Sequence, residues 1–265
     1  IFEVQFSQSS GGSPWSQQGG DGSNRTFRNQ EYGFLQWRNV TASRSVLEEM
    51  GVGQFDDNTG PQTSATVNDV AEPRATHTVY FACDTYNEGN DVYTTASNDC
   101  GTGTNANDER PSWKKYQVYY REARTGNAAN SGINFRELRY AEVLLGLAEA
   151  QAKLGNITSS GNASDPAVDL MNQVRDRVNL DGYNDGAGAV SSESDAMDAL
   201  YHEFVLEFTG EPPLFNFLLR NPSYLEQLNP NAPASSVPSP YLLPIPIEEI
   251  ENNPDISSGD QNPGY

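Results

Sequence analysis

Residues 134–154 read NFRELRYAEVLLGLAEAQAKL, and this stretch decides the fold because it predicts an amphipathic helix. Apolar and small residues recur at spacings of three and four, which places them on one face of a helix. These residues are Leu138, Ala141, Leu145, Ala148 and Ala152. Because several of them are alanine, a second helix can approach this face closely.

A second helix is expected soon after the first. It runs from about Pro166 to Leu180, with Asp165 as its N-cap and Pro166 at the first helical position. The polar loop 155–164 joins the two helices, so they are predicted to form a hairpin of the tetratricopeptide type. The fold class that follows is mainly α-helical.

A third helix is predicted to begin near Ser192, because its Ser-x-x-Asp spacing to Asp195 resembles a capping box. Gly210 and Pro212 are expected to end this helix. The later segment 229–240 is too rich in proline to be helical, and we expect an extended wrap or linker there.

Residues 1–130 differ in character, because they are rich in loop-forming residues such as Gly, Ser and Asn. We therefore expect a loop-rich, ligand-binding region over 1–130 and a helical region with a Pro-rich tail over 131–265. One short helix is expected from Thr41 to Met50, ended by Gly51. A few short strands are expected at residues 1–6, 78–82 and 116–121.

Charge is the clearest feature of the composition. Asp and Glu total 36 while Lys and Arg total 16, so the formal net charge is -20. This balance argues against nucleic acid as a partner, since binding to phosphates requires a basic surface. At about 1 M salt the Debye length falls to ~3 Å and the repulsion between the acids is screened, which leads us to predict a halophilic source.

Two cysteines occur, Cys83 and Cys100, and both lie in a stretch of Asn, Asp, Gly and Thr that predicts a loop. An even number of cysteines fits an exported protein with one disulfide that closes this loop, and the alternative is two unpaired thiols. No His and no second Cys pair has the spacing of metal ligands. We expect neither a metal site nor a cofactor.

No run of the sequence approaches the ~20 apolar residues that a membrane-spanning helix needs. The chain begins with strand-like residues that follow no signal peptide, and this start suggests a cut through a longer polypeptide. Any attachment to a membrane is therefore expected to come from a segment outside this sequence.

Four stretches of the sequence, taken in order, carry a family resemblance. They are Ile1–Phe6; Glu72-Pro73-Arg74; Arg139–Leu145 with Ala148-Glu149-Ala150; and Tyr241–Pro246 with the closing Gln261–Tyr265. This ordered set resembles the carboxy-terminal half of the SusD/RagB family, whose members are nutrient-binding lipoproteins of the outer membrane. The resemblance extends over nearly the whole chain.

The resemblance implies a mostly helical SusD-like fold built on tetratricopeptide-like hairpins. It also implies a lipid-anchored receptor on the cell surface that captures oligosaccharide or polysaccharide and delivers it to a TonB-dependent transporter. No enzymatic activity is expected, so we assign no catalytic residue.

One segment departs from the family pattern. After Glu207-Phe208 the relatives commonly have Phe-Glu-Gly-x-Arg and then an Asp, whereas this chain has Thr209–Pro213 and Asn216. Because that Arg and Asp are absent, we expect a buried ion pair to be lost and the region to be repacked, and we predict no site there.

The residues expected to bind glycan lie mainly just before the helix predicted at Thr41. A sugar ring stacks on a flat aromatic side chain, and its hydroxyl groups need amide or Arg partners. The resemblance implies that aromatic residues of this loop take part in binding. The candidates are Trp37, Tyr32, Trp15, Arg38 and Asn39. Trp37 has an alternative role in packing the helix, and Trp113 is a further possibility, although a Trp that opens a strand is more often core.

Two other functions are open at this point. One is a scaffold that docks the transporter and makes no ligand contacts of its own. The other is an acidic exported glycoside hydrolase with two catalytic carboxylates, although so many acids form close pairs by chance. Neither His77 nor His202 has the flanking residues of a catalytic triad, and we expect His202 to be a packing or surface residue of a helix.

Overall fold

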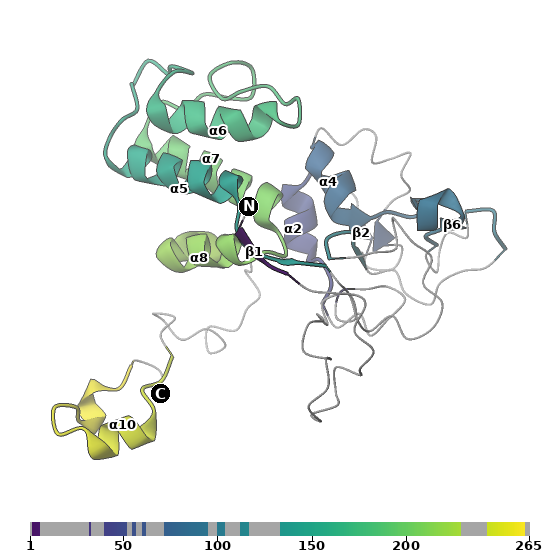
Figure 1. Cartoon of the computed structure of the whole chain (residues 1–265). Helices are drawn as coiled ribbons and strands as arrows, with labels where there is room; N and C mark the ends of the chain where they lie inside the picture. Colours follow the sequence, from purple (N-terminus) through teal and green to yellow (C-terminus); the bar gives the residue numbers. More distant parts are fainter. Residues whose placement is uncertain are drawn as a thin grey trace. The chain divides into compact units, whose positions relative to one another are not determined.

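The computed structural model of the chain describes residues 2–5, 32, 40–51, 55–56, 60–61, 72–94, 100–103, 112–116, 133–228 and 243–262. These residues belong to two compact units, Ile1–Leu214 and Phe215–Tyr265. Helices dominate the first unit, beside sheets of two short strands (Figure 1), so the predicted mainly α-helical fold is confirmed. Within the described ranges, no helix is both long and apolar enough to cross a membrane.

Three helices form the core of the first unit: α5 (Tyr140–Lys153), α6 (Pro166–Asp176) and α7 (Glu193–Phe208). α5 contacts both of the others, and Figure 1 shows α6 running alongside it. Leu145, Ala148 and Ala152 of α5 are completely buried, and two of these three are small residues. The predicted hairpin of the tetratricopeptide type is therefore confirmed.

The predicted boundaries of the first two helices are partly wrong. Residues 135–138 are not helical but form strand β8 (Phe135–Leu138), which pairs antiparallel with β1 (Phe2–Val4). The local pattern cannot reveal this strand, because its partner lies far away in the sequence. The strand expected at the start of the chain is confirmed by the same pairing. α6 ends before Leu180, and Asn179 beyond its end has a positive φ of 57°.

Both predicted ends of α7 are confirmed. The backbone N–H of Asp195 donates to the hydroxyl of Ser192 at 3.1 Å. The second half of the capping box differs, because the Asp195 carboxylate accepts from the N–H and the hydroxyl of Ser191, at 3.0 and 2.9 Å. At the other end Gly210 has a φ of 79°, and α8 (Pro212–Arg220) then begins.

Replacing Ser192 by Ala is expected to lower the free energy of unfolding by about 1 kcal/mol, because an N–H in the first turn of α7 loses its acceptor. Ser194→Ala is the matched control, since Ser194 is exposed in the same turn and is not the cap. Urea denaturation measures both variants. Equal midpoints for the two would contradict the capping role of Ser192.

The region predicted to be loop-rich contains short elements. α2 (Arg44–Glu49), capped by the Ser43 hydroxyl and followed by Gly51 with a φ of 73°, confirms the short helix expected there. α4 (Pro73–Thr78) has no counterpart among the predicted elements. The strand pairs are β2 (Phe55–Asp56) with β3 (Gly60–Pro61), β4 (Val79–Tyr80) with β7 (Ser112–Trp113), and β5 (Thr85–Tyr86) with β6 (Asp91–Val92), the last joined by η2 (Asn87–Gly89). The strand predicted at 78–82 corresponds to β4, and residues 117–121 of the last predicted strand lie outside the described residues.

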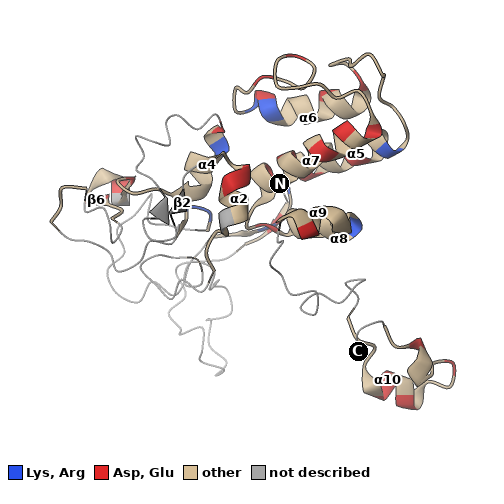
Figure 2. Cartoon of the chain, turned by 180° about the vertical axis from the view of Figure 1, so that it is seen from behind, with Lys and Arg blue, Asp and Glu red and all other residues tan. Residues whose placement is uncertain are grey.

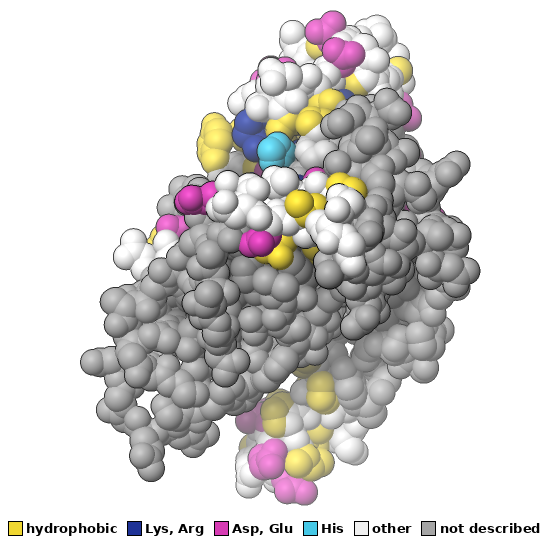
Figure 3. Space-filling view, turned by 90° about the vertical axis from the view of Figure 1, so that its right-hand side faces the viewer, with side chains coloured by type: hydrophobic (Ala, Val, Ile, Leu, Met, Phe, Trp, Pro, Cys, Tyr) yellow, Lys and Arg dark blue, Asp and Glu magenta, His cyan; other side chains and the backbone are white. Residues whose placement is uncertain are grey.

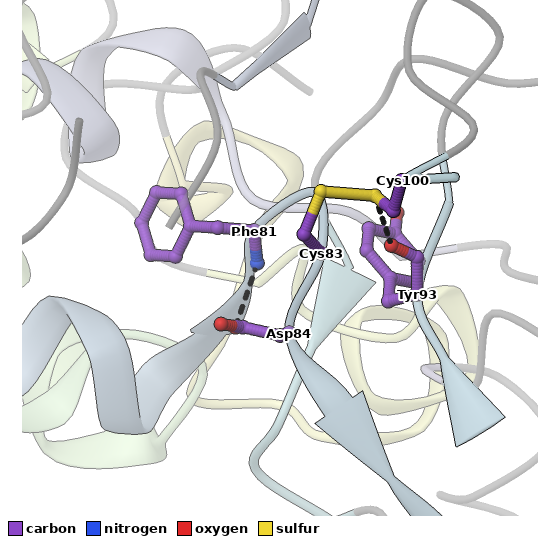
Figure 4. Close-up of a disulfide and its surroundings, with 5 residues drawn as sticks. All are labelled: Phe81, Cys83, Asp84, Tyr93 and Cys100. Atoms are coloured by element: carbon purple, nitrogen blue, oxygen red, sulfur yellow. Dashed lines mark hydrogen bonds between the residues drawn. A yellow bond between two sulfur atoms is a disulfide. The ribbon is translucent and has the colours of Figure 1, made fainter. Parts of the chain in front are cut away.

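A disulfide joins Cys83 to Cys100 and closes a loop (Figure 4). Their Cα atoms are 5.4 Å apart, an ordinary distance for a disulfide. The base of the loop is also hydrogen-bonded, because the N–H of Cys83 donates to the carbonyl of Tyr93 and the N–H of Tyr93 donates to the carbonyl of Asp84, both at 2.8 Å. The covalent link therefore reinforces a turn that backbone hydrogen bonds already define.

The second unit contains α9 (Pro222–Leu228), α10 (Ile247–Asn252) and the 3-10 turn η3 (Ser258–Asp260). The side-chain amide of Gln261 accepts from the N–H of Ile245 at 2.7 Å and donates to its carbonyl at 3.0 Å. The two stretches of the family resemblance near the end of the chain thus contact each other. The Pro-rich segment 229–240 lies outside the described residues.

Candidate functional site

Of the five residues predicted to bind glycan, the structure describes only Tyr32. Its partly exposed ring lies 5.3 Å from the ring of Tyr116, in an edge-to-face arrangement, and 6.1 Å from the ring of Trp113. These three residues form the aromatic cluster. The other four predicted residues lie outside the described ranges, and their roles stay predictions; they are Trp15, Trp37, Arg38 and Asn39.

Trp113 and Tyr116 form the buried base of the aromatic cluster, since each is only 4% exposed. Trp113 is therefore a core residue rather than an open stacking surface. Gly210 lies against its ring, because a Cβ added at this glycine would come within 3.4 Å of the indole. Among the described residues, neither the indole N–H of Trp113 nor the hydroxyl of Thr209 has a hydrogen-bond partner. Within the cluster, Tyr32 is the ring that a ligand can reach.

A network of charged side chains, most of them buried, lies in the first unit. It joins residues in or next to α4, α6 and α7 to two further side chains. These are Arg139, directly before α5, and Lys115, shortly after β7. Its members are Arg74, Lys115, Arg139, Arg175 and Arg177, with the carboxylates Glu72, Glu203, Glu207 and Glu211. We call this set the charge network. Figure 2 shows how few basic segments (blue) the chain has beside its acidic ones (red).

Glu203 is the most deeply buried carboxylate of the charge network, with an exposed fraction of 0%. Arg74 and Arg175 each donate to one of its oxygens, at 2.8 and 2.7 Å, and the hydroxyl of Tyr183 donates at 3.2 Å. Glu72 holds Arg74 from another side, accepting from Nε at 2.6 Å and from Nη2 at 2.9 Å. Each buried charge here is paired and hydrogen-bonded, which is the condition under which such charges are tolerated.

Arg139 is the central cation at the end of α7. It donates to Glu211 at 2.7 Å, to the carboxylate of Glu207 at 2.5 Å and to the backbone carbonyl of Glu207 at 2.8 Å. Arg177 reaches the other carboxylate oxygen of Glu207 at 2.6 Å. The ammonium group of Lys115 donates to Glu211 at 2.7 Å and to two backbone carbonyls, at 2.9 and 3.0 Å. Cations at these carbonyls also complement the negative end of the helix dipole.

These contacts decide the charge of Glu207 and Glu211. Burial alone would raise the pKa of each carboxyl group, but nearby cations outweigh burial and hold both pKa values below the ordinary value of glutamic acid. Arg139 acts on both carboxylates, and Lys115 acts on Glu211. A glycosidase needs a general acid whose pKa is raised, so these two carboxylates do not fit that role.

The Arg and Asp of the family pattern are absent after Glu207-Phe208, but buried ion pairs of another kind occur in this segment. Glu211, inside the segment that departs from the family pattern, is 9% exposed and pairs with both Arg139 and Lys115. The sequence does contain a signal, because Glu203 and Glu207 are four residues apart and so share one face of the largely apolar α7, and Glu211 follows soon after its end. The sequence does not reveal which cations pair with these carboxylates, because the cations come from distant segments of the chain.

A cavity of about 350 Å³ lies beside the charge network. Its wall holds five of the 16 Lys and Arg residues of the chain: Arg74, Lys115, Arg136, Arg139 and Arg177. Glu207, Glu211 and the exposed His77 line it as well. We call it the basic pocket. Figure 3 shows basic side chains (dark blue) directly beside a histidine (cyan) on one face of the molecule. Basic side chains thus gather at this pocket, although the chain as a whole is strongly acidic.

His202 has a structural contact. Its Nδ1 lies 2.7 Å from Glu49, which ties α7 to α2, and the hydrogen bond to Glu49 raises the pKa of this histidine. The side chain is 48% exposed, which agrees with the packing or surface role that the sequence favours. Across the part of the chain that the structure describes, no three His, Cys, Asp or Glu side chains gather where they could hold a metal ion.

Comparisons with known proteins point to one family. The model of the SusD family matches residues 1–235. Among solved structures, the fold is similar to that of a SusD superfamily protein from Bacteroides vulgatus ATCC 8482, with a TM-score of 0.56 and 23% sequence identity. The similarity covers 89% of this chain and 46% of that one, so the chain spans about half the length of this relative. No curated protein matches the sequence.

Proposed function

The chain belongs to the SusD family, and on this premise we propose that it is a non-catalytic receptor that captures glycan and passes it to a TonB-dependent transporter. The match of the family model to residues 1–235 is the observation that carries the proposal. The proposal places the protein on the outer surface of the outer membrane, held by a lipid anchor outside this sequence. It also assigns the aromatic stacking contacts with the ligand to region 1–130 and the helical scaffold to region 131–265.

The arrangement of side chains supports capture of a ligand rather than its conversion. Tyr32 offers a partly exposed ring that rests on two buried rings, and this support reduces the entropy lost on stacking. Burial of an aromatic ring contributes about 1.5–3 kcal/mol. Stacking on two rings, Tyr32 and Trp37, together with a few hydrogen bonds, favours binding, and ordering the ligand opposes it. The balance gives dissociation constants of about micromolar to millimolar. Weak binding suits a receptor that must release its ligand.

Tyr32→Ala and Trp37→Ala are each expected to weaken glycan binding about tenfold, because each removes a stacking surface worth about 1.4 kcal/mol or more. Affinity electrophoresis against a panel of polysaccharides identifies a ligand, and calorimetry then measures the affinity. Tyr140→Ala is the matched control, since Tyr140 is an aromatic residue on α5 that is 67% exposed and outside the predicted site.

Three outcomes would count against parts of this proposal. If no polysaccharide retards the wild-type protein, this chain does not capture glycan. If Trp37→Ala lowers the thermal stability and leaves the affinity unchanged, Trp37 packs the neighbouring helix and does not bind ligand. Release of reducing sugar from any glycan would show that the protein is an enzyme.

Docking of the transporter, without any contact to glycan, is the second candidate function. It is favoured by exposed apolar side chains on one face of α5, where Tyr140, Val143 and Leu147 are 67%, 47% and 46% exposed. A pull-down with the transporter separates the two functions. If docking through this face is the function, Tyr140→Ala releases the transporter and Tyr32→Ala has no effect on any interaction.

A further inference from the structure

We propose that the basic pocket binds an anionic group of the captured glycan, so that the ligand is an acidic saccharide carrying carboxylate or sulfate groups. This inference rests on the proposed function and extends it by naming the class of ligand. A neutral glycan needs stacking surfaces and neutral hydrogen bonds, whereas an acidic one also needs cations placed to meet its oxygens.

Cations outnumber carboxylates around the basic pocket. Its wall holds five Lys and Arg side chains but two carboxylates, Glu207 and Glu211. Behind the wall the other members of the charge network are Glu72, Glu203 and Arg175, so two positive charges remain in excess. This excess stands out in a chain whose formal net charge is -20.

Arg136 is the main source of the excess. Within the described residues, its partly exposed guanidinium forms no hydrogen bond and no ion pair. Glu3 lies opposite Arg136 in the pairing of β1 with β8, but the Glu3 carboxylate accepts a hydrogen bond from Asn134 at 2.8 Å and does not pair with this guanidinium. Among the residues that the structure describes, none therefore occupies the five N–H groups of Arg136, and a ligand can use them.

Arg177 supplies a second set of donors. Its side chain is 56% exposed, and it donates to a single oxygen of Glu207. A guanidinium carries five N–H donors in one plane, so the described residues leave most of those of Arg177 open. Planar pairs of such donors match the oxygens of a carboxylate or sulfate, and arginine is the residue best suited to this contact.

The remaining cations of the wall are held in place before any ligand binds. The side chains of Arg74 and Lys115 are 5% and 15% exposed and are fixed by carboxylates. Charges buried this deeply are screened weakly by salt, whereas exposed charges more than a Debye length away, ~10 Å at 0.1 M, are largely screened. An anion in the pocket therefore senses the cations of the wall more strongly than the distant acids of the surface.

The size and position of the pocket fit one acidic unit of a saccharide. Its volume of about 350 Å³ is near the lower end of the range for ligand sites, roughly 300–1,000 Å³. One short segment also serves both parts of the candidate site, because Lys115 lines the pocket while its neighbours Trp113 and Tyr116 support Tyr32. Lys115 thus connects the pocket to the segment that supports the stacking ring of Tyr32.

Calorimetry on the whole chain tests the inference with two pairs of probes. One pair is trigalacturonate and its carboxyl-reduced neutral form, and the other is a sulfated galactan oligosaccharide and its desulfated form. In any pair that binds, the anionic probe is expected to bind at least about tenfold more tightly than its neutral form in 0.1 M salt. The difference in affinity is expected to shrink at about 1 M salt. Comparison of the two pairs distinguishes carboxylate from sulfate, and a preference for either one supports the inference.

Arg136→Glu is the decisive variant, because this side chain has no ion pair to lose among the described residues. It is expected to weaken binding of the anionic probe about tenfold or more and to leave binding of the neutral probe unchanged. Lys153→Glu makes the same change of charge in the last turn of α5, outside the lining of the pocket, and is the matched control. Thermal unfolding verifies that both variants are folded.

The outcomes separate this inference from the function on which it rests. If neutral probes bind as tightly as anionic ones, or if Arg136→Glu binds the anionic probe like the wild type, the pocket does not select an acidic saccharide and the receptor function stands. If no glycan of any kind is bound by the wild-type chain, the receptor function itself is overturned.

Discussion

Replacing Glu203 by Gln is expected to lower the free energy of unfolding by about 3 kcal/mol or more, the typical cost of removing one partner from a buried ion pair. Glu203 is completely buried and accepts hydrogen bonds from Arg74 and Arg175, both at less than 3 Å. The variant keeps the size of the side chain, so the effect comes from the two guanidinium groups that lose a counter-charge. Equilibrium unfolding in urea measures the loss.

The control for this prediction is Asp198→Asn, which removes a negative charge from an exposed position of the same helix. It is expected to change the stability by less than about 0.5 kcal/mol. If the two variants unfold at the same denaturant concentration, neither Glu203 nor the charge network around it stabilises the fold.

Loss of the disulfide is expected to have the second-largest effect, about 3 kcal/mol, because a crosslink of this span removes conformational entropy from the unfolded chain. Cys83 and Cys100 are 17 positions apart in the sequence. The measurement compares the unfolding of the wild-type protein in oxidising buffer with that of the double variant Cys83→Ser and Cys100→Ser.

A reducing agent provides the control for the disulfide. It is expected to destabilise the wild-type protein to about the level of the double variant, and to leave the double variant itself unchanged. Equal stability of the oxidised wild type and the double variant would show that the hydrogen bonds of Tyr93 hold the loop without help from the crosslink.

The helices that the sequence predicts well are those whose signals are local. The spacing of Leu145, Ala148 and Ala152 follows the helix period, and Ser192 is a cap that can be recognised from its neighbours. The sequence does not predict α4, because its residues show little apolar periodicity. The pattern over residues 135–138 indicates helix, but these residues form β8, because they pair with β1 at the start of the chain.

The sequence predicts less of the candidate site, because most of its contacts join residues that are distant in the sequence. Tyr32 could be singled out because aromatic residues in a polar loop suit stacking, but its contact with Trp113 depends on tertiary structure. The charge network unites residues from five separate segments, and no spacing in the sequence relates Arg74 to Glu203. The sequence shows that basic residues are scarce, with 16 in the chain. Only the structure shows that five of them line a single pocket.

The ion pairs of the charge network also bear on the order in which the protein folds. Arg74 and Glu203 are 129 positions apart in the sequence, and Arg139 and Glu211 are 72 positions apart. Closing such long loops is entropically costly and slow, whereas the hairpin of α5 and α6 forms from neighbouring segments. During synthesis the segment with α4 therefore cannot form these ion pairs until α7 has emerged from the ribosome.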